Sequence, residues 1–411
     1  MSDVSIERVR TQVRSLSEAG RTPQGGVTRL TYSPEYRLGM QMVTEMMQAA
    51  GMEVHCDPVG NLIGVYWGKE IDLPAVMTGS HLDSVPEGGE LDGALGVMSA
   101  IECVRSWHEN KWRPRRTVKV VATIEEEGTL FGLGCFGSRA LAGELCGKSP
   151  DDFKDAEGRT LAWHMKQMGL EPDGALQAAV IDPREVACFV EFHIEQGEEL
   201  ILSNTPCAVV TDIIGIDRHW IVIQGTANHA GTTRMDRRQD ALVAAAALIS
   251  EVNRHALASQ GQYVATVGKL ELSPNATNVI PGRVMLCLET RGAKPEVLED
   301  ARANTLKYLA EMENRFGVKT EIAKRLYAPP VPLSAGIIAK LKEAAEETGV
   351  RYVEMPSWAG HDAKIMATIV PTGMIFVPSV NGSHTPQEDT RWEYAAEALK
   401  VLNQALKKLA E

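Results

Sequence analysis

The segment TGSHLDSVPEGGELDG, residues 78–93, places one histidine among acidic side chains in a glycine-rich stretch. Asp83 lies two residues after His81, and Asp92 lies 11 residues after it. Imidazole nitrogen and carboxylate oxygen are the ligands that divalent cations such as zinc take in proteins. Asp83 is placed to hold the second nitrogen of the imidazole, as carboxylates behind metal ligands do. The segment is therefore a candidate metal-binding loop.

Further polar residues follow apolar, strand-like runs. Glu125–Glu127 follow TVKVVATI, His193 lies near the end of ACFVEFHI, and His384 follows MIFVPS. Two metal ions about 3.5 to 4 Å apart need a carboxylate between them to offset their charge. Three histidines and two carboxylates, each delivered at the end of a strand, suit such a pair.

A structural interpretation competes with this one. A single histidine at a strand end most often has a structural role, and a run of three glutamates is most often a solvated surface. Here the run precedes the glycine-rich segment GTLFGLGCFGS, and adjacent acids that face a cavity are unfavourable without a cation. Spacing alone leaves both interpretations open.

The elements that would position these residues alternate between strand and helix. Residues 74–80, 117–124 and 187–194 are apolar runs, and from Gly93 onward apolar residues recur at spacings of three and four. This alternation predicts an α/β sheet with substantial parallel character. In such sheets ligands gather beyond the carboxyl ends of the strands, where the candidate ligands lie.

The middle of the chain has a different pattern. It predicts the order β-α-β-β-α-β, with strands at 219–226, 263–272, 283–291 and 318–326 and helices at 236–256 and 295–316. We expect residues 213–327 to form an inserted α+β module, and 1–212 with 328–411 to form the catalytic domain. YAPPVP, residues 327–332, is the expected linker.

Composition excludes several classes of protein. The chain has 411 residues, 42 basic and 54 acidic, with a net charge of −12. Such a charge gives no electrostatic reason to bind nucleic acid or an anionic membrane. No apolar run reaches the roughly 18 residues that span a bilayer. The seven cysteines lack paired spacing, so we expect reduced thiols and a cytoplasmic protein.

Several motifs occur together in one order: SHLDSV, LDGALGV, EEEGTLFG, EFHIEQG, NHAGTTRMDRRQDA, NATNVIPG, AGHDA and GSH. Together they resemble the hydantoinase/carbamoylase branch of the M20 metallopeptidase-like amidohydrolases. HIEQG and HAGTT are specific to that branch. The resemblance runs from GGVTRLTYSPE, residues 25–35, to the last helix.

The resemblance implies a dinuclear metal centre. Asp92 would bridge two divalent ions, His81 and His193 would complete one site, and Glu127 and His384 would complete the other. The ions would be zinc, manganese, cobalt or nickel, which the ligand types do not distinguish. Glu126 matches the family's general base, which takes a proton from the attacking water.

The resemblance also implies substrate-binding residues. The inserted module would act as a lid and dimerisation domain, and His229 would reach the active site of the second subunit of a homodimer to stabilise the oxyanion. Arg291 would grip a carboxylate, with Asn278 beside it. Gln196, Gly360 and His361 are further candidates. A surface salt bridge for Arg291, a turn role for Asn278 and a loop-orienting role for His361 are the alternatives.

Two departures from the family pattern affect the substrate pocket. Trp358 stands where relatives carry a small residue, and would either narrow the pocket or pack in its wall. The run Asn381-Gly382-Ser383-His384 is one residue shorter than the usual form, which makes His384 the least secure ligand.

The expected function is hydrolysis of the ureido C–N bond of N-carbamoyl-L-amino acids, giving the L-amino acid, carbon dioxide and ammonia. The alternative is the same chemistry on allantoate. A more distant one is an M20 aminopeptidase or deacylase, against which HIEQG argues. A binding protein without catalysis is the fourth possibility, and the retained Glu126 and ligand set argue against it.

Overall fold

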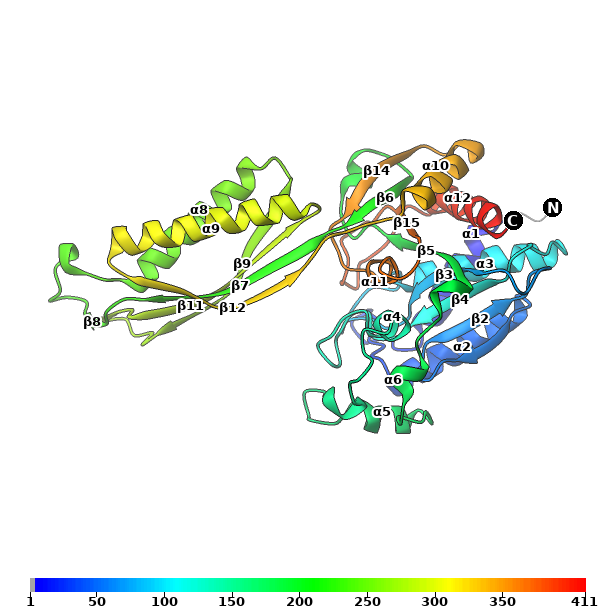
Figure 1. Cartoon of the computed structure of the whole chain (residues 1–411), viewed down its shortest axis with the longest axis horizontal. Coiled ribbons are helices and arrows are strands. Elements are labelled where there is room, and N and C mark those ends of the chain that lie inside the picture. The colour runs from blue at the N-terminus through cyan, green and yellow to red at the C-terminus, as the bar shows by residue number, and fades with distance from the viewer. Residues whose placement is uncertain (1–3) are drawn as a thin grey trace. The chain divides into compact units, whose positions relative to one another are not determined.

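The computed structural model describes residues 4–411, and this part of the chain divides into two compact units. Of the described residues, one unit comprises 4–211 and Pro332–Glu411, and the other comprises Asp212–Val331. Each unit has its own hydrophobic core. Figure 1 shows the elements of both units, which are described one at a time below.

A nine-stranded mixed sheet forms the centre of the first unit. Its strands are β1 (Glu53–Cys56), β2 (Leu62–Tyr66), β3 (Ala75–His81), β4 (Val118–Thr123), β5 (Val186–Ile194), β6 (Cys207–Ile213), β13 (Val331–Pro332), β14 (Tyr352–Ser357) and β15 (Thr372–Val377). The order is β1-β2-β4-β3-β5-β15-β6-β13, and β14 pairs with β6. The four strands β4-β3-β5-β15 run parallel, while β1, β2 and β6 pair antiparallel with their neighbours. The parallel strands end at one edge of the sheet.

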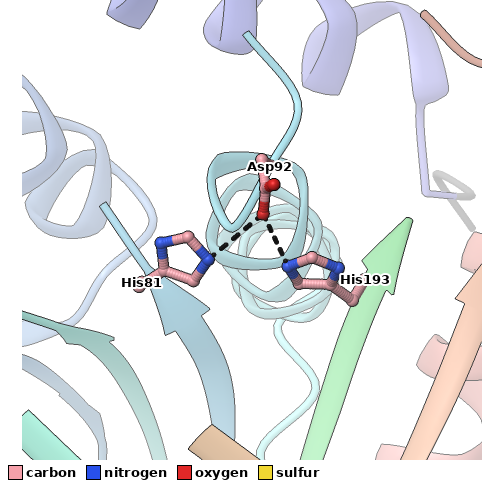
Figure 2. Close-up of side chains that lie close together, drawn as sticks. All are labelled: His81, Asp92 and His193. Carbon is pink, nitrogen blue, oxygen red and sulfur yellow. Dashed lines mark ion pairs between the residues drawn. The ribbon is translucent and has the colours of Figure 1, made fainter. Parts of the chain in front are cut away.

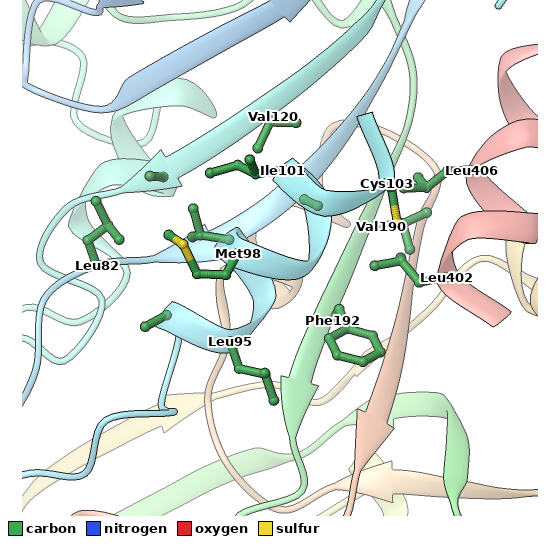
Figure 3. Packing of buried hydrophobic residues seen from close by; sticks show 14 of the residues in the cluster. Leu82, Leu95, Met98, Ile101, Cys103, Val120, Val190, Phe192, Leu402 and Leu406 are labelled. Carbon is green, nitrogen blue, oxygen red and sulfur yellow. The ribbon is translucent and has the colours of Figure 1, made fainter. Parts of the chain in front are cut away.

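Helices cover this sheet. They are α1 (Ile6–Ser17), α2 (Pro34–Ala49), α3 (Ala94–Glu109), α4 (Phe136–Leu141), α5 (Leu161–Gln167), α6 (Ala175–Ala178), α7 (Glu199–Leu202), α10 (Ala335–Thr348), α11 (Asp362–Met366) and α12 (Trp392–Ala410), with short 3-10 turns at Pro150–Asp152 and Pro183–Glu185. Helix α3 is buried almost all round, since it packs on β3 and β5 and is itself covered by α1 and α12. Figure 3 shows Leu95, Met98 and Ile101 of α3 beside Phe192 of β5 and Leu402 of α12. This packing holds the start of α3 close to the ends of β3 and β5.

The second unit is a four-stranded antiparallel sheet with two helices. Its elements are β7 (Gly215–Gln224), β8 (Asn228–His229), a 3-10 turn (Met235–Arg237), α8 (Ala241–Ala258), β9 (Tyr263–Ser273), β10 (Val279–Ile280), β11 (Arg283–Gly292), α9 (Pro295–Phe316) and β12 (Lys319–Ala328). The sheet order is β12-β7-β11-β9, and β8 pairs with β10 in a separate two-stranded sheet. In β7 buried residues alternate with partly exposed ones, because one face of the sheet packs on the helices.

The expected mixed α/β architecture with helices around a central sheet is confirmed. The six predicted elements of the middle segment are present, and the sequence pattern missed β8 and β10 between them. The expected linker 327–332 is partly strand, since β12 extends to Ala328 and β13 occupies Val331–Pro332. All seven cysteines have free thiols. Among the described residues, no helix combines the length and apolar character required to cross a membrane.

Candidate metal centre

The carboxyl ends of the four parallel strands bring the predicted ligands together. His81 is the last residue of β3, His193 lies near the end of β5, and Glu127 follows β4. His384 lies in the loop after β15, and Asp92 lies two residues before α3. Strand register therefore places five ligand-type side chains from distant parts of the chain at one edge of the sheet.

The first cluster consists of His81, Asp92 and His193. Asp92 Oδ1 lies 3.3 Å from His81 Nε2 and 3.1 Å from His193 Nε2. Figure 2 shows the two imidazoles converging on this one oxygen. All three side chains are at most 5% exposed, and their ligand atoms lie within 4.8 Å of one another, as a metal ion requires.

The outer nitrogens of both imidazoles face backbone carbonyl oxygens. His81 Nδ1 lies 3.0 Å from Asp83 O, and His193 Nδ1 lies 2.8 Å from Ile194 O. A carbonyl only accepts hydrogen bonds, so in the neutral form the ring proton sits on Nδ1. The lone pair of His81 Nε2 then faces Asp92 Oδ1, whereas His193 Nε2 also accepts a hydrogen bond from the backbone N–H of Gly93 at 3.2 Å. Two lone pairs that face each other in a buried site require a proton or a cation between them, so this donor set fits a metal ion.

The second cluster consists of Asp92, Glu127 and His384. His384 Nε2 lies 3.3 Å from Asp92 Oδ2 and 3.4 Å from Glu127 Oε2. Glu127 Oε1 is buried and has no hydrogen-bond partner within the described part of the chain. Such an orphaned oxygen has no reason to be buried unless something else binds it. Asp92 thus serves both clusters, with one carboxylate oxygen in each.

The electrostatics of the centre also call for a positive charge. Burial raises the pKa of Glu127 to about 7 and raises the pKa of Glu126 well above its ordinary value. Burial opposes protonation of His81, yet the hydrogen bond to Asp92 and nearby carboxylates raise its pKa well above the ordinary value. The surplus of buried carboxylates therefore draws protons into the site, and a divalent cation would replace them.

Glu126 is held beside the clusters by Asp83. The Asp83 carboxylate accepts hydrogen bonds from the backbone N–H groups of Glu126 and Glu127, both at 3.1 Å. The contact of Asp83 with the His81 ring uses its backbone carbonyl, while Asp83 Oδ1 lies 3.7 Å away from the ring nitrogen. Cys135 Sγ donates to Glu126 Oε1 at 3.2 Å.

The loop before His384 has an unusual backbone conformation. Asn381, Gly382 and His384 all have positive φ, at 65°, 81° and 58°. With this left-handed turn, His384 Nε2 lies 3.3 Å from Asp92 Oδ2. The other departure, Trp358, is half-buried in the segment before Gly360.

The predicted substrate-binding residues divide between the two units. In the first unit, Gln196 Nε2 donates to Asp92 Oδ2 at 2.8 Å, and the buried His361 ring lies 4.6 Å from that of His193. Gly360, next to His361, is exposed. A third potential metal group, Glu191 with His193 and His361, shares His193 with the first cluster.

Three predicted residues lie in the second unit. His229 is exposed on β8, whose partner β10 follows Asn278, and Ala230 N donates to Asn278 O at 2.9 Å. Arg291 lies near the end of β11 that is remote from His229 and Asn278, and its Nε donates to Glu289 Oε1 at 2.7 Å. The expectation that Asn278 lies beside Arg291 is therefore wrong within one chain, because the length of β11 separates the two residues.

Sequence reasoning missed two residues of the centre. Ser383 Oγ donates to Asp92 Oδ2 at 2.9 Å, and the buried Glu388 accepts hydrogen bonds from the backbone of the Asp92 loop. The segment HTPQEDT gives no signal for Glu388, because its backbone partners, Leu91 and Asp92, lie almost 300 residues away in the chain.

Comparisons with known proteins identify the family of the chain. Residues 77–408 match the model of peptidase family M20/M25/M40. An N-carbamoyl-L-amino-acid amidohydrolase of Paenarthrobacter aurescens is 36% identical over 100% of this chain and 99% of its own length. An allantoate amidohydrolase of Escherichia coli is 37% identical over 96% of both chains. The crystal structure of an amidase of the hydantoinase/carbamoylase family from Burkholderia multivorans superposes with a TM-score of 0.91, at 32% identity, over 99% of this chain and 98% of the other.

The chain belongs to peptidase family M20/M25/M40 and is a hydrolase. Its resemblance to the hydantoinase/carbamoylase branch, inferred from the motifs, is confirmed.

Proposed function

We propose that this chain is a dinuclear metal amidohydrolase that cleaves the ureido C–N bond of N-carbamoyl-L-amino acids. The observation that carries the proposal is the division of Asp92 between two clusters. One carboxylate oxygen faces His81 and His193, and the other faces His384 beside Glu127. A carboxylate used in this way is the usual bridge between two metal ions.

Two divalent cations bound by these five residues would supply Lewis-acid activation of water and of the substrate carbonyl. Zinc, manganese, cobalt and nickel all accept such nitrogen and oxygen ligands. The orphaned oxygen of Glu127 and the facing lone pairs of His81 and Asp92 support this assignment.

Glu126 is the proposed general base. Its backbone is held by Asp83, and its half-buried side chain directly precedes a proposed ligand without belonging to either cluster. Glu126 takes a proton from the attacking water, which adds to the carbamoyl carbon. It then returns the proton to the terminal nitrogen, and the C–N bond breaks to release ammonia. The carbamate left on the amino acid decomposes to carbon dioxide and the free amine.

We further propose a homodimer in which His229 serves the partner's active site. Register within the second unit supports this arrangement. Arg283 and Arg291 mark opposite ends of β11 and are eight residues apart, which corresponds to about 26 Å at roughly 3.3 Å per residue. His229 and Asn278 lie at the Arg283 end. A small substrate cannot touch Arg291 and His229 of one chain across that distance, so the proposed contacts require two chains.

The proposed substrate class rests on the relatives and on the arginine. Arg291 is the proposed partner of the substrate carboxylate, through two parallel hydrogen bonds. Allantoate is also a ureido carboxylate, and the allantoate amidohydrolase relative, as similar as the carbamoylase, makes it the second candidate substrate.

Ammonia release by protein reconstituted with zinc or manganese tests the proposal. The panel comprises several N-carbamoyl-L-amino acids, allantoate, N-carbamoyl-β-alanine, an N-acetyl amino acid and a dipeptide. We expect ammonia from N-carbamoyl-L-amino acids. Release from allantoate alone would transfer the same mechanism to the second candidate. Cleavage of only the acetyl or peptide compound would refute the ureido assignment.

A further inference from the structure

Glu388 connects the loop that carries Asp92 to the loop that carries His384. Its side chain is 6% exposed, and its Oε1 accepts hydrogen bonds from Leu91 N at 2.9 Å and from Asp92 N at 3.0 Å. Its Oε2 lies 2.9 Å from Ser383 Oγ, directly before His384. One buried carboxylate therefore binds the backbone of the Asp92 loop and the side chain of the residue that precedes His384.

Ser383 extends this connection to the Asp92 side chain. Its Oγ lies 2.9 Å from Asp92 Oδ2 as well as from Glu388 Oε2, and Gln196 Nε2 donates to it at 3.2 Å. The hydroxyl has one hydrogen, so it donates to only one of the two carboxylates at a time. Glu388 is thus linked to Asp92 in two ways, directly through the Asp92 backbone N–H and indirectly through the Ser383 hydroxyl.

The packing around Glu388 is tight. A Cβ added at Gly89 would meet Glu388 Oε1 at 2.2 Å and Glu388 Cβ at 2.4 Å. Glycine is therefore required at position 89 for the carboxylate to reach Leu91 and Asp92. Chain segments some 300 residues apart in sequence meet here without space for a solvent layer.

We infer that Glu388 is a positioning residue that aligns Asp92 and His384 for two metal ions. The inference rests on the proposed dinuclear centre and goes beyond it, because Glu388 itself belongs to neither ligand cluster. Without the carboxylate, the N–H groups of Leu91 and Asp92 lose their acceptor, and only Gln196 and Ser383 remain to orient the Asp92 carboxylate.

The test compares Glu388→Ala and Glu388→Gln with Asp57→Ala. Asp57 is a matched control, because this buried carboxylate accepts from Val59 N, Gly60 N and Asn61 N and touches no proposed ligand. Zinc affinity and stoichiometry of the metal-free proteins are measured by competition with a chelator, and thermal unfolding is recorded in parallel.

Residues behind metal ligands typically contribute 10- to 100-fold to metal affinity, so we expect Glu388→Ala to weaken zinc binding by about this factor. Glu388→Gln should recover part of the loss, since its amide oxygen still accepts from both N–H groups. Asp57→Ala should lower the unfolding temperature while zinc affinity stays at the wild-type value. Equal zinc affinity in Glu388→Ala and wild type would overturn the inference. Wild-type protein that binds fewer than two zinc ions would refute the dinuclear proposal instead.

Gly89→Ala displaces the same carboxylate without removing it. We expect the zinc affinity of this variant to be as low as that of Glu388→Ala. The double variant should bind zinc with the same affinity as Glu388→Ala alone. Full zinc affinity in a folded Gly89→Ala protein would also contradict the role of Glu388.

Discussion

At the scale of single residues, Asp92 directs its two carboxylate oxygens to different partners. Oδ1 faces His81 and His193, and Oδ2 faces His384, Gln196 and Ser383. Glu126 stands apart from these contacts, although it directly precedes Glu127. Asp92 is thus placed to hold cations, and Glu126 is the separate group proposed to transfer protons.

Glu126→Gln should therefore remove turnover and keep the metal. Glutamine has nearly the same shape, but it cannot take a proton from water. We expect kcat to fall by about 10²- to 10⁴-fold, the usual contribution of a general base. Metal content measured by elemental analysis should equal that of the wild type. Loss of metal together with activity would show that Glu126 is a ligand.

The buried carboxyl group of Asp57, away from the metal centre, should make the stability of the fold depend on pH. Burial raises its pKa to about 6 from an ordinary value of 3.8, although hydrogen bonds from Asn61, Gly60 and Val59 oppose the shift. The folded state therefore holds a proton that the unfolded state has released between these pH values. The contribution of Asp57 to the free energy of unfolding should fall as pH rises from about 4 to 6, by roughly 3 kcal/mol at most, and stay level above.

Urea unfolding of metal-free wild type and Asp57→Asn between pH 4 and 7 measures this effect. The decline in the variant should be smaller than in the wild type by this contribution, whereas the exposed Asp72→Asn should keep the full decline. Parallel profiles for wild type and Asp57→Asn would contradict the assignment.

At the scale of elements, the start of α3 must lie against the end of β3. Gly93 precedes α3 with a φ of +64°, and a Cβ there would meet the His81 ring at 2.5 Å. Gly93→Ala should cost about 1–2 kcal/mol for its left-handed backbone alone, and the displaced imidazole should weaken metal binding. Gly336→Ala in α10, where the new Cβ finds only an ordinary contact, should be neutral or stabilising. Thermal unfolding of both variants measures the change in stability, and zinc titration measures the change in metal affinity. Zinc binding by Gly93→Ala with wild-type affinity would refute the contact between position 93 and the His81 ring.

Sequence patterns predicted the elements that carry most of the proposed ligands. The apolar runs at β3, β4 and β5 are long, buried on both faces and end at polar residues, which makes them recognisable. Two-residue strands such as β8 and β10 have no periodicity to detect. Glu388 could not be predicted, because its proposed role depends on hydrogen bonds from residues 91 and 92. The residues next to it in the chain do not indicate such long-range contacts.

At the scale of the whole molecule, the proposed substrate contacts exceed the reach of one chain. His229 and Arg291 lie toward opposite ends of the sheet in the second unit. A closed two-fold dimer would give each active site the residues that its own chain cannot supply.

Mixed dimers of Glu126→Gln and His229→Ala test this arrangement. Each variant should be inactive alone. In a hybrid, the chain with an intact Glu126 receives His229 from its partner, so one of two sites works. Random exchange of subunits should restore about a quarter of wild-type activity. No recovery in hybrids that are shown to form by mass spectrometry would place His229 in its own chain's site or outside the reaction.

Titration of metal-free protein with zinc or manganese, followed by ammonia release from an N-carbamoyl-L-amino acid, tests the central claim most directly. We expect activity to rise to a plateau at two equivalents of metal per chain, and Asp92→Ala to show no activity at any ratio. A plateau at one equivalent with full activity, or an active Asp92→Ala protein, would contradict a dinuclear centre shared through Asp92.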